Sequence, residues 1–471
     1  MKSFACLALA TLAMTAAFAA EPLLTVSTAG HYWQTATAPH WAAATPVPAG
    51  AVALELDPTR SAQTIEGFGG CFNEQGWEVL GLLSPAQRDT VLRDFFDPAG
   101  ACRFVFGRLP MGANDYALDW YSFDETRDDF ALAHFSIERD RHHLVPYLKA
   151  ALRFNPALRL WASPWSPPAW MKTNGHYAGL PASVNDLKPE QAGREMQTQF
   201  RMEPEVLSAY ANYFARFLTA YRAEGITVQA VHVQNEPNSA QNFPSCVWTP
   251  ADLATFIGAF LGPTLRAASP STELWLGPIE RPQIERIDAI LGRADVRRFI
   301  AGVGLQWAGR GAIADVQRKY PDLRLMQTET ECGNGANDWA AAEHTFGLLH
   351  HYFNHGAGAY MYWNLVLDET GTSRWGWRQN AMVTVNRARR TVTYNPEFIL
   401  LQHFSHFVRP GARRLALADP AVPALAFANP DGGMVVVFAN LGDAAATLQV
   451  SSAGRSLTAT VPARSFSTLR F

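Results

Sequence analysis

The sequence predicts an α/β fold, a (β/α)₈ TIM barrel with an attached β-sandwich domain. Two observations predict it. Between residues 63 and 400, short apolar segments alternate with helical patterns, which favours parallel strands joined by crossover helices. After Pro410, closely spaced strand-like segments are joined by turn residues, which is typical of a small sandwich. We therefore place the barrel at residues 63–407 and the C-terminal sandwich at residues 408–471.

The candidate barrel strands are short runs rich in apolar residues, and there are eight of them, the number that closes a TIM barrel. They are 64–72, 103–110, 158–163, 228–236, 272–278, 303–308, 323–331 and 359–366. Helices with explicit start signals separate some of these runs. Ser84-Pro85 and Thr249-Pro250 each place a capping hydroxyl before a first-turn proline, so both predict a helix start. Residues 205–221 carry an apolar stripe at helical spacing, which predicts packing against the barrel wall.

The sandwich strands are predicted on each side of the turn Asn429-Pro-Asp-Gly-Gly433. They are 424–428, 434–439, 447–451, 456–462 and 465–471. Residues 21–62 contain an extended, Pro-punctuated stretch, and we expect part of this segment to join the sandwich.

Residues 1–20 have the pattern of a cleavable signal peptide. Lys2 gives a basic start, residues 4–18 are almost wholly apolar or small, and Ala17-Phe18-Ala19 offers the small-x-small cleavage pattern. No later segment has 18 uninterrupted apolar residues, so we expect no integral membrane association. A periplasmic or secreted location follows.

The four cysteines after the leader, Cys71, Cys102, Cys246 and Cys332, are too few for a disulfide framework.

Composition and charge limit the kinds of molecule that this protein is expected to bind. A chain of 471 residues with 48% hydrophobic residues can bury a large core. A net charge of −3 gives no electrostatic reason to expect nucleic acid or an anionic membrane as a partner. The 14 tryptophans suit the apolar faces of sugar rings, although most tryptophans in any large protein belong to its core.

Glutamates lie at the ends of two of the predicted strands. Asn235-Glu236-Pro237 comes after an apolar run, and Glu329 and Glu331 close another. In a (β/α)₈ barrel the carboxyl ends of all strands meet at one mouth, so these side chains can face each other. A protonated carboxyl and an ionised carboxylate are what glycosidic bond cleavage needs. The competing class, a non-catalytic carbohydrate-binding protein, would have no use for such a pair.

Several collinear motifs from about Ile65 onward resemble the family 30 glycoside hydrolases, in particular their glucosylceramidase branch. The motifs are Gly67-Phe-Gly-Gly70, Arg108-Leu-Pro-Met111 with Asp115, Ala162-Ser-Pro-Trp-Ser-Pro-Pro-Ala-Trp-Met-Lys-Thr-Asn-Gly175, Gln234-Asn-Glu-Pro237 and Trp363-Asn-Leu365. The resemblance implies that Glu236 is the acid/base, with Asn235 on the sugar 2-hydroxyl, and that Glu329 is the nucleophile. It also implies a group of substrate-binding residues, namely Arg108, Asp115, Trp170, Trp307, Trp363 and Asn380.

The activity implied by the resemblance is that of a retaining exo-β-glycosidase acting on a carbohydrate or glycolipid. Glucosylceramide-like or β-1,6-linked glucosides are the expected substrates, and endo-β-1,6-glucanase, β-xylosidase and β-fucosidase activities are the alternatives. No cofactor and no metal is expected. His350, His351 and His355 lie on a helical stretch without a His-Glu-x-x-His pattern, which favours ordinary solvated or capping histidines.

Three departures from the family pattern affect the expected site: a second glutamate beside Glu329, a missing tyrosine, and a polar insertion at 184–202 near the mouth. Glu331 is a second candidate nucleophile beside Glu329, and strand alternation would send both side chains to one face. Gln306-Trp307-Ala308 lacks the tyrosine that relatives place near the nucleophile, so we expect Arg108 or the polar insertion 184–202 to orient Glu329. The leaving-group side should then be open and polar.

Overall fold

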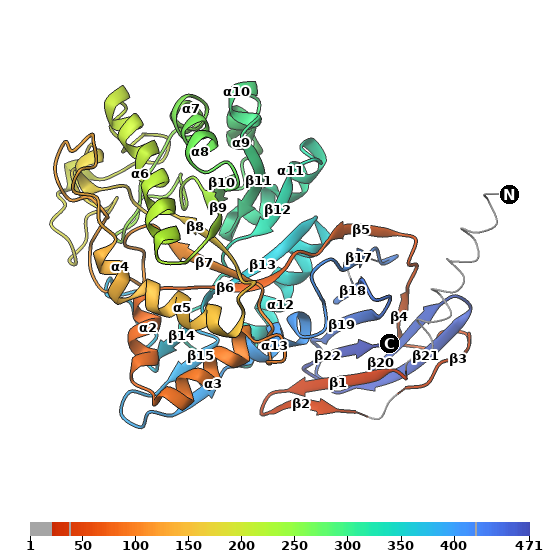
Figure 1. The fold of residues 1–471 in the computed structure, drawn as a ribbon. Coiled ribbons are helices and arrows are strands. Elements are labelled where there is room, and N and C mark those ends of the chain that lie inside the picture. The colour runs from red at the N-terminus through yellow and green to blue at the C-terminus, as the bar shows by residue number, and fades with distance from the viewer. Residues whose placement is uncertain (1–20, 37–38, 420–421) are drawn as a thin grey trace.

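The computed structural model describes residues 21–36, 39–419 and 422–471, and the predicted signal peptide lies outside this part of the chain. It consists of a closed barrel and, beside it, a β-sandwich (Figure 1). The barrel strands are β6 (Gly67–Cys71), β7 (Phe106–Pro110), β8 (Arg159–Ser163), β9 (Val228–His232), β10 (Glu273–Ile279), β11 (Ile300–Leu305), β12 (Arg324–Gln327) and β13 (Ala357–Asn364). Each pairs in parallel with its neighbours, and β13 closes the ring against β6. The predicted fold class is confirmed.

Helices surround the barrel (Figure 1). The α-helices are α2 (Glu74–Gly81), α3 (Pro85–Phe96), α4 (Glu138–His142), α5 (Leu144–Phe154), α6 (Pro204–Ala223), α7 (Pro250–Thr255), α8 (Gly262–Ala268), α9 (Ile284–Leu291), α10 (Ala294–Arg297), α11 (Ile313–Lys319), α12 (Trp339–Asn354) and α13 (Pro396–Ser405). The π-helix η3 (Phe256–Leu261) joins α7 to α8, and the 3₁₀ turns are η1 (Ala169–Met171), η2 (Pro189–Gln191) and η4 (Trp307–Ala312).

Both predicted helix starts are confirmed. The Ser84 hydroxyl caps α3 in a reciprocal arrangement with Gln87, and the Thr249 hydroxyl accepts from the backbone N–H of Asp252 at the start of α7. The apolar stripe of 205–221 is the buried face of α6. These caps and stripes fix the outer ring of helices, and the barrel strands inside it bring their carboxyl ends to one mouth.

The sandwich has two sheets built from both ends of the chain. One contains β1 (Leu23–Thr28), β2 (His31–Thr35), β5 (Ser61–Thr64), β17 (Arg413–Leu415), β18 (Ala424–Ala428), β19 (Met434–Asn440) and β22 (Ser465–Arg470). The other contains β3 (Ala42–Ala43), β4 (Val52–Glu55), β20 (Ala446–Ser452) and β21 (Arg455–Val461). A small third sheet, β14 (Val366–Asp368), β15 (Val383–Val385) and β16 (Val392–Tyr394), lies beyond β13.

A buried histidine connects barrel and sandwich. His403 of α13 shares hydrogen bonds of 2.8 Å with Thr468 of β22 and with Ser27 of β1. It is fully buried, and burial lowers its pKa to about 3. The neutral ring therefore bridges both chain ends of the sandwich to the helix that leaves the barrel.

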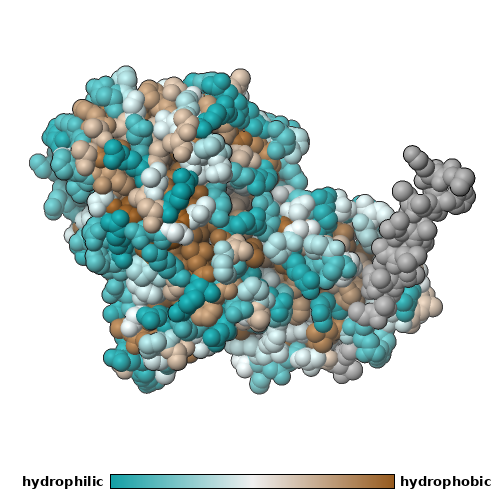
Figure 2. All heavy atoms as spheres, in the orientation of Figure 1, coloured by the Kyte–Doolittle hydropathy of each residue, from teal (hydrophilic) through white to brown (hydrophobic). Residues whose placement is uncertain are grey.

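Hydrophilic and hydrophobic residues are interspersed over the face of the molecule seen in Figure 2. Among the described helices, none combines the length and apolar composition needed to cross a bilayer. Cys71, Cys102, Cys246 and Cys332 are buried and unpaired in this structure.

Candidate active site

Glu236 lies just beyond the end of β9 at the barrel mouth. Its backbone is in the left-handed region, with φ of +49°, and its N–H donates to the carbonyl of Pro278 at 3.0 Å. This conformation is uncommon outside glycine, so neighbouring contacts must hold it. The side chain is 9% exposed, which leaves the carboxyl at the floor of the mouth rather than in open solvent.

Glu329 lies beyond the end of β12 and is held by three donors. Its carboxylate accepts from Arg108 Nη1 at 2.8 Å, from the Trp307 indole at 3.0 Å and from Gln306 Nε2 at 3.3 Å. Hydrogen bonds to an ionised carboxylate are among the stronger ones, and three of them fix its orientation. The expected contact of Arg108 with Glu329 is therefore present. Trp307, which the resemblance placed among the substrate-binding residues, supplies one of these three donors.

Gln306 joins the two glutamates. Its Nε2 lies 3.0 Å from Oε1 of Glu236 and 3.3 Å from Oε2 of Glu329, so the two oxygens are at most 6.3 Å apart, the sum of these distances. The two carboxyl groups therefore face each other across the barrel mouth. Gln306 follows β11, so three separate strands supply this group.

Arg108 is the fully buried cation at the centre of the site. It donates to Ser163 at the end of β8 (3.2 Å), to Oδ1 of Asn235 (2.6 Å) and to Glu329. Its guanidinium carbon lies 4.3 Å from the ring centroid of Trp165, which stacks on Trp363. A buried charge is costly unless it is paired and hydrogen-bonded, and Arg108 is both.

The environments of the two glutamates differ. Burial and the adjacent charge of Glu329 raise the pKa of Glu236 well above its usual range. Burial also raises the pKa of Glu329, but Arg108, Trp307 and Gln306 act in the opposite direction by stabilising its ionised form. Glu236 is thus the better candidate for a protonated carboxyl and Glu329 for a carboxylate.

Glu331 has a different set of partners. It forms ion pairs with Arg310 and, at 3.0 Å, with His344. The expected alternation of Glu329 and Glu331 on one strand face is wrong, because β12 ends at Gln327 and both residues lie in the irregular segment that follows.

Trp170 and Asn380 both make hydrogen bonds within the protein. The Trp170 indole donates to the carbonyl of Asp124, and Trp165 of the same motif packs on Arg108. Both ends of the Asn380 amide bond to protein groups: Nδ2 donates to Glu397 at 2.9 Å, and Oδ1 accepts from the N–H of Gly335 at 2.9 Å. Asn380 therefore holds the loop after Glu331.

Other polar atoms in the site have no partner among the described residues. Oδ1 of Asp115 and Nε1 of Trp363 are buried and make no hydrogen bond there. The structure also gives no acceptor to Nδ2 of Asn235, whose Oδ1 is bonded by Arg108 and Gln306. Unsatisfied buried polar groups are costly, so these atoms are well suited to bind the hydroxyl groups of a sugar.

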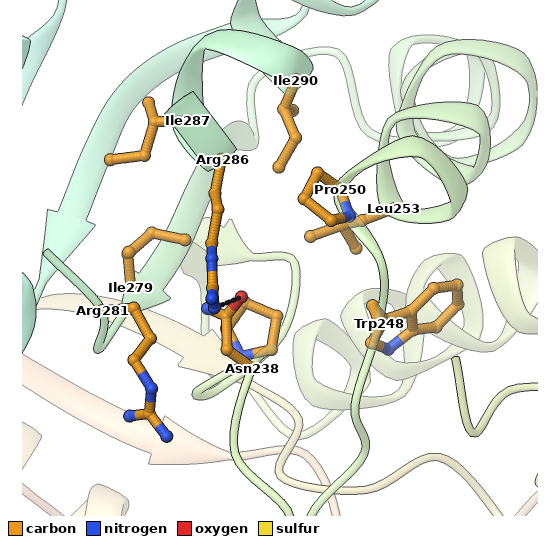
Figure 3. Close-up of a pocket in the computed structure, with 10 residues that line it drawn as sticks. Asn238, Trp248, Pro250, Leu253, Ile279, Arg281, Arg286, Ile287 and Ile290 are labelled. Atoms are coloured by element: carbon orange, nitrogen blue, oxygen red, sulfur yellow. Dashed lines mark hydrogen bonds between the residues drawn. The ribbon is translucent and has the colours of Figure 1, made fainter. Parts of the chain in front are cut away.

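The loop that follows Glu236 is supported from outside the barrel. Figure 3 shows Arg286 of α9 directed toward Asn238, and its Nη1 donates to Oδ1 of Asn238 at 3.0 Å. Glu195 of the insertion forms ion pairs with Arg286 and, at 3.3 Å, with Arg281. The insertion thus reaches the Glu236 loop through Arg286, and it makes no hydrogen bond or ion pair with Glu329 among the described residues.

No three His, Cys, Asp or Glu side chains in residues 21–36, 39–419 and 422–471 are arranged to hold a metal ion. The barrel mouth therefore combines the carboxyl of Glu236 with the carboxylate of Glu329, whose oxygens are at most 6.3 Å apart. Unpaired polar atoms beside them, such as Oδ1 of Asp115, are suited to bind sugar hydroxyls. This is the equipment for acid-assisted cleavage of a glycosidic bond.

Comparison with known proteins agrees with this geometry. The glycosyl hydrolase family 30 TIM-barrel domain matches residues 65–408, and the family 30 beta sandwich domain matches residues 411–469. Putative glucosylceramidase 1 of Caenorhabditis elegans is 28% identical over 85% of this chain and 78% of its own length. An endo-1,6-beta-D-glucanase of Neurospora crassa is 28% identical over 76% of this chain and 74% of its own. The solved structure of SrfJ from Salmonella typhimurium has the same fold, with a TM-score of 0.85 and 24% identity over 96% of this chain and 99% of that one. The chain belongs to glycosyl hydrolase family 30 and is a glycoside hydrolase.

Proposed function

We propose that this enzyme is a retaining exo-β-glycosidase that hydrolyses β-glucosides through a covalent intermediate on Glu329. The observation that carries the proposal is the position of Gln306 between the two glutamates. Its hydrogen bonds limit their nearest oxygens to 6.3 Å. Retaining enzymes place the two carboxyl groups about 5–5.5 Å apart, whereas inverting enzymes need roughly 6.5–9.5 Å to admit a water molecule.

In the first step, the Glu329 carboxylate attacks the anomeric carbon while Glu236 gives its proton to the departing oxygen. In the second step, Glu236 takes a proton from water, the water oxygen attacks the same carbon, and Glu329 leaves. Arg108 and Trp307 hold Glu329 in its ionised, oriented form. Nδ2 of Asn235 is suited to the sugar 2-hydroxyl, where a hydrogen bond strengthens in the transition state.

Contacts between opposite loops support exo action. β9 and β13 lie on opposite sides of the barrel, and the loops that follow them meet where the Trp377 indole donates to Asn242 at 3.1 Å. Trp375 also packs on Trp120, with the ring centroids 4.8 Å apart, and Trp120 lies in the same loop as Asp115. Loops joined in this way would close the Asp115 side of the site and leave room for one terminal sugar.

The leaving group would depart on the other side, past the loops after β11 and β12. Arg310 and Glu331 lie there as partly exposed charged groups, beside the polar ring of His344. They favour a polar leaving group, so we propose that β-1,6-linked or other polar glucosides are hydrolysed at least as well as glucosylceramide. The two named types of relative act on one or the other, as their names state.

The stereochemistry and the substrate can be tested together. A panel of aryl β-glycosides identifies the sugar, and NMR of the first-formed product identifies the anomer. We expect β-product from β-glucoside. α-Product would refute the double displacement, and a strong preference for a xyloside or a fucoside would show that the enzyme's sugar is not glucose.

The N-terminal sequence also supports a periplasmic or secreted location, which N-terminal sequencing of the exported protein would test.

A further inference from the structure

A third buried glutamate lies next to the two at the barrel mouth. Glu280 directly follows β10 and is 1% exposed. Its carboxylate accepts from the N–H of Asn238 at 2.9 Å, from Nδ2 of Asn238 at 3.2 Å and from the Ser239 hydroxyl at 2.8 Å. Neither step of the proposed mechanism uses this residue.

The contacts of Glu280 lead directly to Glu236. The N–H of Ser239 donates to the carbonyl of Glu236 at 3.0 Å, and the N–H of Glu236 donates to the carbonyl of Pro278 at 3.0 Å. The end of β10 therefore holds Glu236 at two points. Pro278 accepts a hydrogen bond from the Glu236 N–H, and Glu280 fixes Ser239, whose N–H donates to the Glu236 carbonyl. A residue in the left-handed conformation needs such support.

We propose that Glu280 is a positioning residue for Glu236: it fixes the Asn238-Ser239 turn and thereby the direction in which the Glu236 carboxyl enters the site. The inference rests on the proposed acid/base role of Glu236. It assigns to Glu280 no contact with substrate.

The charge of Glu280 has a second consequence. Burial and the charge of Glu329 are the main causes that raise the pKa of Glu236, and the negative charge of Glu280 adds to them. The titratable and charged groups around Glu280 are Glu236, Arg281 and Arg286. Arg281 lies 3.9 Å from the Glu280 carboxylate, and Arg286 is linked to it through a hydrogen bond to Asn238. Glu195 forms ion pairs with both arginines. Burial also raises the pKa of Glu280, so its negative charge acts on Glu236 at pH values where Glu280 has lost its proton. Without that charge, Glu236 would lose its own proton at a lower pH.

The test compares Glu280→Gln and Glu280→Ala in the full chain. For each variant, kcat/KM is measured against pH on two aryl β-glycosides of the preferred sugar, one with a poor and one with an activated leaving group. Glu280→Gln keeps an acceptor for Asn238 but removes the charge, so its basic limb should move to lower pH, with little change in the maximum. Glu280→Ala releases the turn, so the poor leaving group should lose at least about tenfold more than the activated one.

A matched control is Glu74→Gln. Glu74 is also a buried glutamate, paired with Arg139 and bonded to the N–H of Leu118, and has no contact with the Glu236 loop. It should move neither the basic limb nor the ratio between the two substrates. Equal losses on both substrates in Glu280→Ala, or an unmoved basic limb in Glu280→Gln, would overturn the inference.

The proposed function fails on a different result. Glu236→Gln is measured on the same pair of substrates, and if it shows no dependence on the leaving group, the acid/base assignment itself is wrong. If Glu236→Gln behaves as expected and the Glu280 variants do not, only the positioning role is lost.

Discussion

Trp307→Phe tests how the nucleophile is held, because it removes a single donor and keeps the aromatic ring. In the structure the Trp307 indole donates to Oε1 of Glu329 at 3.0 Å, while Arg108 and Gln306 bond to Oε2. A hydrogen bond to a charged group contributes about 1.5–3 kcal/mol. We therefore expect kcat/KM to fall roughly ten- to 150-fold at the optimum.

The pH profile should change in a defined direction. The Trp307 donor lowers the pKa of Glu329, so its removal raises that pKa. Because the first step needs the ionised nucleophile, less of the enzyme is active at acid pH, and the acid limb of kcat/KM moves to higher pH.

The measurement is kcat/KM against pH on an activated aryl glycoside, with Trp170→Phe as the matched control. The Trp170 indole donates to the carbonyl of Asp124, not to a glutamate, so its removal should leave the acid limb in place. An unmoved acid limb in Trp307→Phe with less than a threefold loss would refute the reasoning. The same movement in Trp170→Phe would show that the effect is not specific to the Glu329 contact.

Three further predictions follow from the site. A 2-deoxy-2-fluoro glycoside should label Glu329, and Glu331→Gln should keep activity within a few-fold because Glu331 pairs with Arg310 and His344; peptide mapping that found the label on Glu331 would reverse the assignment. Glu236→Ala should lose far more activity on poor than on activated leaving groups, and azide should restore turnover as a β-glycosyl azide; equal losses on both, with no azide product, would contradict the acid/base role. Trp377→Ala combined with Asn242→Ala should open the Asp115 side, so that an aryl β-gentiobioside releases intact disaccharide, which chromatography detects; release of disaccharide by the unmodified enzyme would instead mean that the site is already open.

Much of this architecture could be predicted from the sequence because its causes are local. Ser84 and Thr249 cap helices through contacts within three residues, and the strands of the barrel read as short apolar runs. The topology then brings residues after β9 and β12 to one mouth, whatever their separation in sequence. Glu236 and Glu329 could be paired on this ground alone.

The finer positions depend on contacts that sequence does not display. The motif 162–175 contains Trp165 and Trp170, and only the packing of Arg108 on Trp165 separates them. Asn380 shows no partner in the sequence, but its amide bonds to Glu397 and to the backbone of Gly335. In each case the contact comes from a residue more than 15 positions away in the sequence.

The same limit explains why strand alternation failed at Glu331. The period of two applies inside a strand, where neighbouring strands fix the backbone. At a barrel mouth the functional residues lie one to four positions beyond the strand end, as Glu236 and Glu329 do, and there individual hydrogen bonds set the backbone instead. Glu236 and Trp307 both adopt left-handed φ angles, of +49° and +48°. Both residues bond to the groups at the centre of the site, where Arg108 joins β7 to Ser163 at the end of β8 and to residues that follow β9 and β12. The catalytic geometry is therefore a property of this buried hydrogen-bond network, and substitutions such as Glu280→Ala and Trp307→Phe should alter it without altering the barrel.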